Sequence, residues 1–498
     1  MKHPWSKDVA KALTKIFKLK AWRRNQLDAI NATLSGEHCF VLMPTGGGKS
    51  LCYQLPAVVR SGKTHGVTIV VSPLLSLITD QIQSLCEKEI GAAPWTGTMS
   101  KQEKAAVTSD LRSKDPSLCL LYVTPESMMQ SGELKGILKD LQKRSLIARF
   151  VIDEAHCLSQ WGHDFRPDYI LLGKHLALDF SGIPILALTA TANGVVQQDI
   201  IKNLQIGSCV KLTQSFNRPN LRYEVRNKTK EAMNDLIRII TVDHAGKCGI
   251  VYCFSKRDCE QVASDLVSRG NVRAHHYHAG MSTNDRQRIQ QDWQRGVLQV
   301  LCATIAFGMG IDKPDVRFVV HYSLPSSLEG YYQETGRAGR DGGPSECILF
   351  YTYRDFLGIQ RMVEQEPNVQ QVERRLVNAR RVVAFCLNKL DCRRMQVLDY
   401  FSEKFSPADC RKTCDNCMRG QTVVQQDVTN YVVSAIKLIQ RLTESDSITM
   451  AQCIDVFRGS KNKKVIIFTN SFGSYPQHMH LTMRVSFLDC RCRSSFAR

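Results

Sequence analysis

The sequence predicts an α/β protein in which two lobes, each built on a doubly wound parallel sheet, precede a helical metal-binding subdomain. Short apolar segments of strand length alternate with stretches of helical period over residues 38–213, and the same pattern returns over 222–370. Such alternation is typical of parallel strands joined by crossover helices. A glycine-rich segment follows the first strand, and a cysteine cluster follows the second lobe. Together these observations predict a nucleotide-binding α/β fold with a metal centre.

The expected strands of the first lobe are short apolar runs at 39–43, 69–71, 118–123, 150–152 and 185–188. A linker is expected at 214–221. The second lobe then continues with runs at 249–254, 272–276, 299–303, 318–321 and 347–351. Uninterrupted apolar runs of this length are typical of strands buried on both faces of a parallel sheet.

A candidate phosphate-binding loop follows the first expected strand. Its glycines let backbone N–H groups close around phosphate oxygens, Lys49 can reach the β- and γ-phosphates, and Ser50 can offer its hydroxyl to Mg²⁺. Met43 stands where the usual pattern has its first glycine, and the alternative is a glycine-rich turn before an amphipathic helix. The residues of the loop are Met43, Pro44, Thr45, Gly46, Gly47, Gly48, Lys49 and Ser50.

Two adjacent acids end the expected strand at 150–152. Asp153 stands at the carboxyl end of this strand, where a parallel sheet places a Mg²⁺ ligand. Glu154 is placed to orient or deprotonate an attacking water. Adjacent acids after a strand can also cap a helix. Their position about 100 residues after a Lys-Ser phosphate loop favours the catalytic interpretation.

A third motif lies in the second lobe and runs from Gln333 to Arg340. Arg337 and Arg340 are spaced to line one side of a loop or of a first helical turn. Guanidinium groups at such positions neutralise charge on a transferring γ-phosphate. The sequence therefore predicts an NTPase whose site is divided between two lobes.

Composition and charge agree with this class. The chain has 498 residues, of which 43% are apolar and 23% charged, as in soluble globular proteins of about three or four domains. No apolar stretch reaches the ~20 residues of a membrane span, and no signal-peptide core is seen. Lys and Arg number 66 against 47 Asp and Glu, a net charge of +19, which favours a nucleic acid partner. The chain has 19 cysteines, and several of them, such as Cys39, Cys119, Cys253 and Cys302, are scattered through expected strands, which fits a reducing compartment.

An amphipathic helix is expected at 6–18, with Ser6 as its cap. Val9, Leu13, Ile16 and Phe17 share one face, and four lysines form the opposite one. The lysine face either contacts DNA or is simply solvated, and solvation is the commoner role of such a face.

The ordered motifs resemble those of superfamily 2 helicases, at 45–50, 71–74, 124–126, 153–156, 189–191 and 333–340. Three further segments, at 22–26, 157–169 and 306–314, resemble the RecQ DNA helicases, and their residues are most similar to those of fungal members. The resemblance covers roughly 5–460 and implies two RecA-like lobes. It also implies that Gln26, with Arg23, reads adenine. Arg24 departs from the pattern, because such proteins usually carry proline there.

The resemblance implies an ATP-dependent 3′→5′ DNA helicase that works in DNA repair and recombination in the nucleus, with ATP and Mg²⁺ at the divided site. Single-stranded and forked DNA are the implied partners, and a topoisomerase or a single-strand-binding protein is implied by resemblance alone. An RNA helicase is the alternative enzyme class. The cysteine cluster after the second lobe and the segment at 157–169, which is similar to the aromatic-rich loop of the RecQ proteins, argue against it. A DNA-binding fragment that does not unwind is the alternative of another class.

Candidate DNA contacts lie in and around the segment that follows the paired acids. Aromatic side chains in an exposed Gly- and Pro-containing loop stack on unpaired bases, whereas the alternative for the tryptophan is a core anchor. Hydroxyls at strand ends position a backbone without reading sequence, although each can equally be a turn residue. The candidates are Trp161, Phe165 and Arg166 in the loop, and Ser72, Thr124 and Thr304 at strand ends.

A cysteine cluster follows the second lobe and comprises Cys392, Cys410, Cys414 and Cys417. Four thiolates with short spacings and one distant member suit tetrahedral Zn²⁺, with no position left open for chemistry. The cluster is similar to the zinc subdomain of the RecQ proteins. Zinc is therefore expected to be structural.

The expected domains follow from these assignments. They are 1–37 (helix and adenine-reading motif), 38–213 (first lobe), 222–370 (second lobe), 371–420 (zinc subdomain), 425–464 (partial winged helix) and 465–498 (atypical tail). The helical period after residue 425 resembles the opening of the family's winged-helix domain, and the likeness is expected to stop near Lys464. The tail is then a translated intron, an altered frame or a short isoform, and the strand-separating hairpin would be missing.

Overall fold

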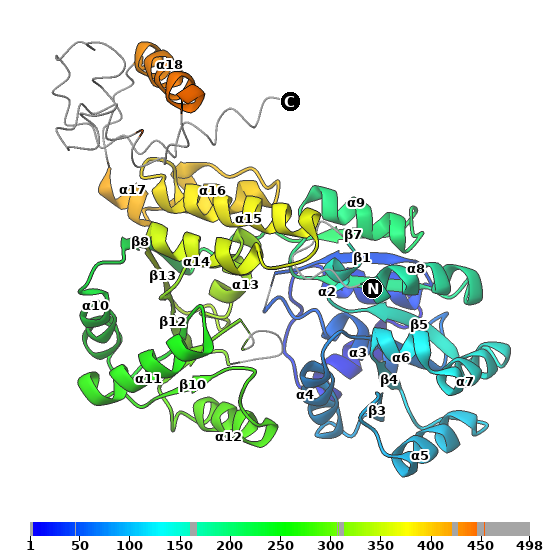
Figure 1. The fold of residues 1–498 in the computed structure, drawn as a ribbon. Coiled ribbons are helices and arrows are strands. Elements are labelled where there is room, and N and C mark those ends of the chain that lie inside the picture. Colours follow the sequence, from blue (N-terminus) through cyan, green and yellow to red (C-terminus); the bar gives the residue numbers. More distant parts are fainter. Residues whose placement is uncertain are drawn as a thin grey trace, which may run out of the picture. The chain divides into compact units, whose positions relative to one another are not determined.

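The computed structural model describes residues 3–44, 46–159, 167–305, 307, 313–420, 427–445 and 453. The chain forms two compact units, Met1–Arg419 and Gly420–Arg498. The first unit contains two α/β lobes and a helical subdomain (Figure 1). In the described part of the chain, no helix combines the length and apolarity needed to cross a membrane.

The first lobe is built on a parallel sheet whose described strands follow the order β3-β4-β2-β5-β6-β1-β7. Non-consecutive neighbours show that crossovers connect the strands, as a doubly wound sheet requires. The strands are β1 (Cys39–Leu42), β2 (Val67–Val71), β3 (Ala92–Trp95), β4 (Leu120–Val123), β5 (Ile147–Ile152), β6 (Ile185–Thr189) and β7 (Val210–Thr213).

Helices cover both faces of this sheet, because successive strand residues point to opposite faces. Val41 packs into one apolar cluster, and its neighbours Phe40 and Leu42 pack into the other. The Val41 face is covered by α1 (Ser6–Lys11), the π-helical turn η1 (Ala12–Ile16), α2 (Gln26–Leu34), α3 (Leu51–Val58) and α4 (Leu75–Cys86). The other face is covered by α5 (Lys101–Arg112), α6 (Pro125–Gln130), α7 (Gly132–Lys143), η2 (Ala155–Leu158), α8 (Pro167–Asp179) and α9 (Gly194–Asn203).

The second lobe repeats the design with a parallel sheet in the order β10-β11-β9-β12-β13-β8. Its described strands are β8 (Leu221–Asn227), β9 (Cys248–Tyr252), β10 (Ala274–Tyr277), β11 (Val300–Ala303), β12 (Val316–His321) and β13 (Ser345–Tyr351). One face packs on α10 (Ala232–Arg238), η3 (Ile239–Asp243) and α11 (Lys256–Gly270). The other packs on α12 (Thr283–Gln294), α13 (Leu328–Thr335) and α14 (Tyr353–Val363).

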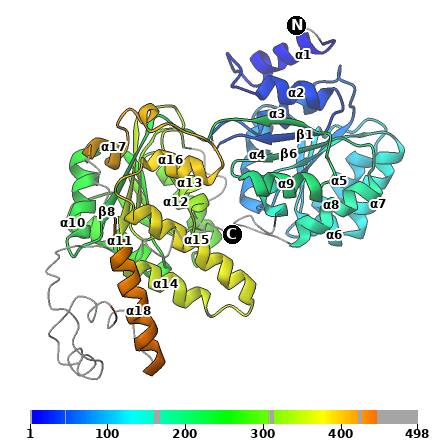
Figure 2. The ribbon, with the colours of Figure 1, turned by 90° about the horizontal axis from the view of Figure 1, so that it is seen from above.

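The helical subdomain packs against the second lobe (Figure 2). Its long helix α15 (Val369–Leu387) contacts α13 and α14, and α16 (Arg393–Tyr400) and α17 (Asp415–Arg419) contact the edge strand β8. The 3₁₀ turn η4 (Pro407–Cys410) lies beside α16. In the second unit, α18 (Thr429–Ser445) has the helical period that the sequence predicts there.

Three strands of the structure are missing from the sequence prediction, namely β3, β7 and β8. All three are edge strands. Edge strands need fewer apolar residues, because one side of the strand faces no neighbour, and they tolerate proline, which β3 carries at Pro94. Strand β8 also begins at Leu221, so the expected linker at 214–221 overlaps it by one residue.

The N-terminal helix is amphipathic as predicted, but the expected cap is wrong. Ser6 is the first helical residue rather than the cap, and its hydroxyl accepts a hydrogen bond from the His3 N–H at 3.3 Å. The apolar face is buried at Val9, Leu13 and Phe17. The four lysines, Lys7, Lys11, Lys15 and Lys18, are exposed.

Candidate nucleotide site and metal centre

The phosphate loop lies between β1 and α3, at the carboxyl edge of the first sheet. Gly46 and Gly48 have φ angles of +81° and +84°, which side chains with a Cβ rarely adopt. The Gly47 N–H donates to the Pro44 carbonyl at 2.9 Å and closes the turn. Among the described residues, no acceptor is found for the amides of Gly48, Lys49 and Ser50. These amides at the start of α3 form the kind of cradle in which phosphate oxygens bind.

Gln26 and Arg23 hold this loop from outside. The Gln26 side chain accepts from the Arg23 N–H at 2.8 Å and donates to the Gly48 carbonyl at 3.1 Å. Arg23 also donates through its guanidinium to the Gly46 carbonyl. The segment around Arg24 is tied to the end of β7, because Asn25 Nδ2 donates to the Thr213 carbonyl at 2.9 Å. This bond restrains the loop without the proline of the family pattern.

Asp153 and Glu154 follow β5 at the same edge of the sheet. The Asp153 N–H donates to the Val71 carbonyl at 3.0 Å and fixes the strand end. Burial and the neighbouring Glu154 carboxylate raise the pKa of Asp153 well above its ordinary value, and Lys49 opposes the rise. Glu154 makes no side-chain cap to the helical turn η2 that follows it, so the helix-cap alternative does not describe this residue.

A chain of polar groups leads from Glu154 to the second lobe. His156 is fully buried, with Nδ1 at 3.3 Å from Glu154 Oε2 and 3.0 Å from Thr189 Oγ1. Thr189 Oγ1 donates to the Thr191 carbonyl at 3.1 Å. The Thr191 hydroxyl in turn accepts from Gln333 Nε2 at 3.0 Å. The paired acids and the Gln333 motif are thus connected through described side chains and the Thr191 backbone carbonyl.

The arginines of the third motif lie in the turn after α13. Arg337 is buried, whereas Arg340 is half-buried. A Cβ built on Gly46 would lie 3.4 Å from Arg340 Cγ, so the stem of Arg340 packs on the phosphate loop. An arginine from one lobe therefore lies on the phosphate loop of the other. A Cβ at position 46 would make only an ordinary van der Waals contact with Arg340, so it is the φ of +81° that favours glycine there.

The candidate DNA contacts have different surroundings. Ser72 is buried at the end of β2, and its Oγ has no hydrogen-bond partner among the described residues. Thr124 caps α6, because its hydroxyl accepts from the Ser127 N–H at 3.2 Å. Thr304 follows β11 and donates its N–H to the Tyr277 carbonyl at 3.3 Å. Thr45, Trp161, Phe165 and Arg166 lie outside the described residues, as do 306, 308–312 and 465–498.

The four cysteines of the expected metal centre come together, with ligand atoms within 4.8 Å of one another. Cys392 immediately precedes α16 instead of lying within a helix. Cys414 Sγ lies 3.9 Å from Cys392 Sγ, and the N–H groups of Arg393 and Cys417 donate to Cys414 Sγ. The interaction with Cys392 first, and then the two amide hydrogen bonds, lower the pKa of Cys414. Four sulfurs with one thiolate stabilised by amides fit tetrahedral Zn²⁺.

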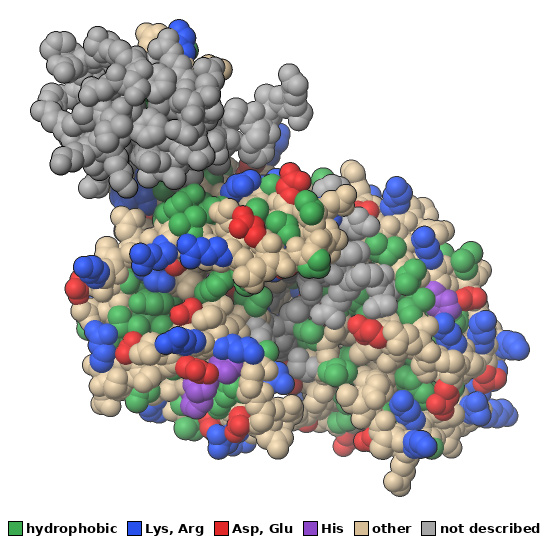
Figure 3. All heavy atoms as spheres, viewed as in Figure 1, with side chains coloured by type: hydrophobic (Ala, Val, Ile, Leu, Met, Phe, Trp, Pro, Cys, Tyr) green, Lys and Arg blue, Asp and Glu red, His purple; other side chains and the backbone are tan. Residues whose placement is uncertain are grey.

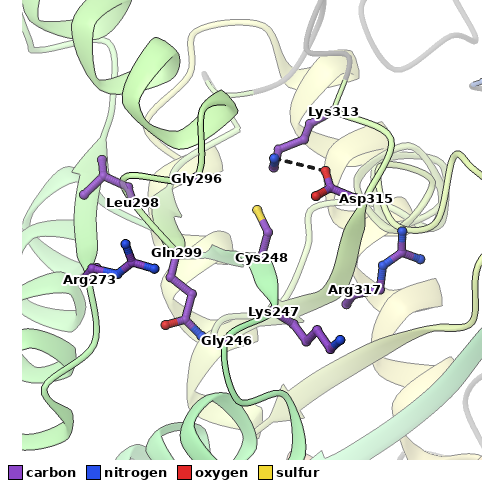
Figure 4. A pocket seen from close by; sticks show the side chains of 10 residues that line it. All are labelled: Gly246, Lys247, Cys248, Arg273, Gly296, Leu298, Gln299, Lys313, Asp315 and Arg317. Atoms are coloured by element: carbon purple, nitrogen blue, oxygen red, sulfur yellow. Dashed lines mark ion pairs between the residues drawn. The ribbon is translucent and has the colours of Figure 1, made fainter.

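Other polar clusters have simpler explanations. Histidines gather over α11 and β10 (Figure 3), where Glu260, His276 and His278 lie within metal-binding reach of one another. His278 Nε2 lies 3.0 Å from Glu260 Oε1, and one imidazole–carboxylate hydrogen bond accounts for that pair. A basic cavity of about 270 Å³ lies at the amino ends of β9, β11 and β12 (Figure 4). Of the motif segments, only 306–314 reaches this cavity, through Lys313, and Lys313 is paired with Asp315 at 3.0 Å.

Sequence reasoning misses the residues that hold the arginine turn. Arg218 and Asn220, from the linker, donate hydrogen bonds to the backbone of that turn. The sequence feature from which they could have been found is the Asn-Arg-Pro-Asn segment at 217–220. Proline fixes φ, so a linker that carries one is locally restrained.

The family models that match this chain succeed one another in the order of its two lobes, helical subdomain and second unit. Family models match for DEAD/DEAH box helicase at 23–200, helicase conserved C-terminal domain at 231–342, RecQ zinc-binding at 353–418 and RQC domain at 422–476. The RQC match extends to residue 476, past Lys464, near which the sequence was expected to lose its likeness to the family.

Two curated relatives and one solved structure illustrate the similarity. The ATP-dependent DNA helicase hus2/rqh1 of Schizosaccharomyces pombe is 51% identical over 94% of this chain and 35% of its own length. The ATP-dependent DNA helicase Q1 of Rattus norvegicus is 41% identical over 92% of this chain and 72% of its own length. The helicase Lhr of Mycobacterium smegmatis, solved bound to ssDNA and AMP-PNP, has a TM-score of 0.54 at 21% identity. It covers 76% of this chain and 52% of that chain, and at this identity it shows the fold alone.

The two parallel-sheet lobes, with a phosphate loop in one and an arginine turn in the other, define the class of two-lobed helicases with RecA-like folds. Within that class, the chain belongs to the RecQ family, because it carries the RecQ zinc-binding domain and covers most of a relative that is 41% identical. The chain spans about a third of the length of the Schizosaccharomyces pombe relative.

Proposed function

We propose that this chain is an ATP-dependent DNA helicase that moves 3′→5′ on single-stranded DNA and separates duplexes in DNA repair and recombination. The observation that carries the proposal is the packing of Arg340, from the second lobe, on Gly46 of the phosphate loop in the first. A site completed by two lobes couples nucleotide turnover to lobe movement, because the site is whole only when the lobes are together.

The residues divide the chemistry between them. The amides of Gly48, Lys49 and Ser50 hold the phosphates, and the Lys49 ammonium neutralises them. Glu154 orients or deprotonates the attacking water, held by its contact with His156. Arg340 and Arg337 stabilise the charge that spreads over the γ-phosphate oxygens in the transition state. Gln26 and Arg23 lie against the loop on its outer side, where Gln26 reads the adenine edge.

Mg²⁺ is the proposed metal of this site, and the chain's donor set fits it. Asp153 is a buried carboxylate whose raised pKa shows that its charge lacks full compensation. Ser50 supplies the hydroxyl at the start of α3. Asp153 and Ser50 would hold Mg²⁺ there, and the ion would supply positive charge that neutralises the phosphates. The zinc centre is proposed to be structural, because all four positions are sulfurs.

DNA is the proposed polymer, in single-stranded and forked form. The net charge of +19 supplies the electrostatic attraction. The printed names of the relatives, DNA helicases of a fission yeast and a rat, favour DNA over RNA. Trp161, Phe165 and Arg166 are the proposed stacking and phosphate contacts, with Ser72, Thr124 and Thr304 at the backbone. Residence in the nucleus, and association with a topoisomerase or a single-strand-binding protein, are parts of the same proposal.

A strand-displacement assay tests the function. Two short DNA duplexes that differ only in carrying a 3′ or a 5′ single-stranded tail are compared with an RNA duplex of the same sequence and 3′ tail. The account expects ATP- and Mg²⁺-dependent displacement from the 3′-tailed DNA alone. Preference for the RNA duplex would make the chain an RNA helicase. ATP turnover and DNA binding without any displacement would leave a translocase instead.

A further inference from the structure

The linker that joins the lobes reaches directly into the arginine turn. Arg218 Nη2 donates to the carbonyls of Ala338 and Gly339 at 2.9 and 2.8 Å, and Nη1 donates to the Gly336 carbonyl at 3.3 Å. These three peptide groups surround Arg337 and lead to Arg340 in the chain. One guanidinium therefore fixes the backbone on which both arginines are mounted.

Asn220 fixes the far side of the same turn. Its Nδ2 donates to the carbonyls of Gly339 and Gly343, each at 2.9 Å. Gly339 has a φ of +56°, and a Cβ there would come within 2.4 Å of Asn220 Nδ2. The approach of the linker to this turn is thus as close as a glycine permits.

A second arginine, from the zinc subdomain, holds the linker in turn. Arg394 on α16 is 3% exposed, and its guanidinium donates four hydrogen bonds, one of them from Nη1 to Asn217 Oδ1 at 2.8 Å. Its Nη1 donates to the Arg218 carbonyl at 2.7 Å, and its Nη2 donates to the Leu221 carbonyl at 2.7 Å and to Thr413 Oγ1 at 2.8 Å. The planar fork of a guanidinium suits this set of divergent acceptors, which a lysine ammonium does not match.

The chain of bonds ends at the cysteine centre. Thr413 Oγ1 donates to the Cys410 carbonyl at 2.6 Å, and Cys410 is one of the four clustered cysteines. A parallel contact supports the linker near Phe216, which stacks on Phe401 of the subdomain with ring centroids 4.3 Å apart. Phe216 also donates its N–H to Glu403 at 2.7 Å. The subdomain thus contacts the linker at two places, through Arg394 and through Phe401 with Glu403.

We propose that Arg218 and Arg394 are positioning residues through which the zinc subdomain sets the place of Arg337 and Arg340 over the phosphate loop. The inference rests on the proposed function, because it assigns these residues to ATP hydrolysis. Both act through the backbone at 336–339, and a displacement of about 1 Å at a reacting group costs about 100-fold in rate.

The first test compares Arg218→Lys and Arg394→Lys with a matched control, Arg222→Lys. Arg222 lies on the neighbouring strand β8 and donates to Glu346 at 2.8 Å, and among the described residues it makes no hydrogen bond to the arginine turn. The turnover number and KM for ATP are measured with single-stranded DNA. We expect kcat to fall by about 10- to 100-fold in both variants, with KM changed by less than about 3-fold. The control keeps wild-type kcat.

A binding readout separates positioning from general damage to the fold. Arginines over the γ-phosphate recognise ADP with aluminium fluoride but not ADP alone. Arg218→Lys is therefore expected to weaken the ADP–aluminium fluoride complex by about 10-fold or more while the affinity for ADP stays within about 2-fold. An equal loss for both ligands would overturn the proposal, because it would mean that the phosphate loop itself is disturbed.

The zinc end of the chain is tested with a hydroxyl swap. Thr413→Val removes the oxygen that Arg394 and Cys410 share, whereas Thr413→Ser keeps it. Metal analysis should find the same zinc content in both variants. The proposal predicts a lower kcat for Thr413→Val and wild-type kcat for Thr413→Ser. Equal kcat in the two would overturn the connection to the zinc subdomain. Absence of ATP turnover in the wild-type chain would instead refute the proposed function.

Discussion

Gln333 of the second lobe donates its side-chain amide to the hydroxyl of Thr191 in the first lobe at 3.0 Å. Thr191 belongs to the segment after β6, whose Thr189 hydroxyl contacts the buried His156. His156 in turn lies 3.3 Å from Glu154. The proposed general base and the arginine motif are therefore joined by a short polar chain that exists only when the lobes are together.

Removing the hydroxyl of Thr191 should uncouple the two lobes. Thr191→Val keeps the shape of the side chain but loses the bond from Gln333, a net loss of about 1 kcal/mol. If the bond is made mainly in the closed state, kcat should fall about 5-fold. Thr191→Ser keeps the hydroxyl and serves as the control. Equal kcat in the Val and Ser variants would show that this bond has no part in turnover.

Lys49→Ala should abolish ATP hydrolysis and leave single-stranded DNA binding largely intact. Lys49 acts on nucleotide phosphates, whereas DNA contacts are directed mainly at the phosphate backbone and spread over both lobes. Turnover and DNA affinity are measured at one fixed salt concentration. Wild-type turnover in the variant would contradict the assignment of the phosphate loop.

Gly48→Ala should lose ATP binding for a steric reason. A Cβ at Gly48 would lie 2.3 Å from Gln26 Nε2, and the φ of +84° adds strain. Gly182 is a matched control, because its φ is +85° and nothing lies within 4 Å of its Cβ position. Both variants carry a backbone cost of about 1–2 kcal/mol in stability. Only Gly48→Ala should weaken ATP binding, by about 10-fold or more, and equal affinity in the two variants would argue against the loop geometry.

Cys414→Ser should release the metal and destabilise the zinc subdomain. Cys414 is fully buried, accepts hydrogen bonds from the N–H groups of Arg393 and Cys417, and lies 3.9 Å from Cys392 Sγ, so its loss removes the central ligand of the group. Metal analysis should fall from about one zinc per chain to none, with a lowered thermal midpoint. Cys86→Ser, at an exposed free cysteine, is the control. Retained zinc in Cys414→Ser would rule out the proposed ligand set.

The local parts of the site are predictable from the sequence. Lys49, Asp153 and the cysteines stand in short segments whose spacing carries the chemistry, and the carboxyl ends of parallel strands meet at one edge of a sheet. The helix-cap role of Thr124 and the burial of Ser72 are harder to predict from the sequence, because they depend on how each strand end packs against its neighbours.

The long-range parts of the site are not predictable in this way. Arg394 meets the Arg218 carbonyl across a sequence separation of 176 residues, and in the sequence each of these arginines looks like an ordinary surface cation. The edge strands β3, β7 and β8 escape prediction for a related reason, since their place is set by the strands beside them instead of by their own apolarity.

The measurement that tests the central claim most directly is ATP turnover, with and without single-stranded DNA, by the wild-type chain and by Arg340→Lys. Arg340 packs on Gly46 from the other lobe, and a lysine cannot reproduce its planar fork. The account predicts strong stimulation by DNA in the wild-type chain and a loss of roughly 100-fold or more in kcat for the variant, with ATP affinity little changed. Wild-type turnover by Arg340→Lys, or turnover that does not respond to DNA in the wild-type chain, would contradict it.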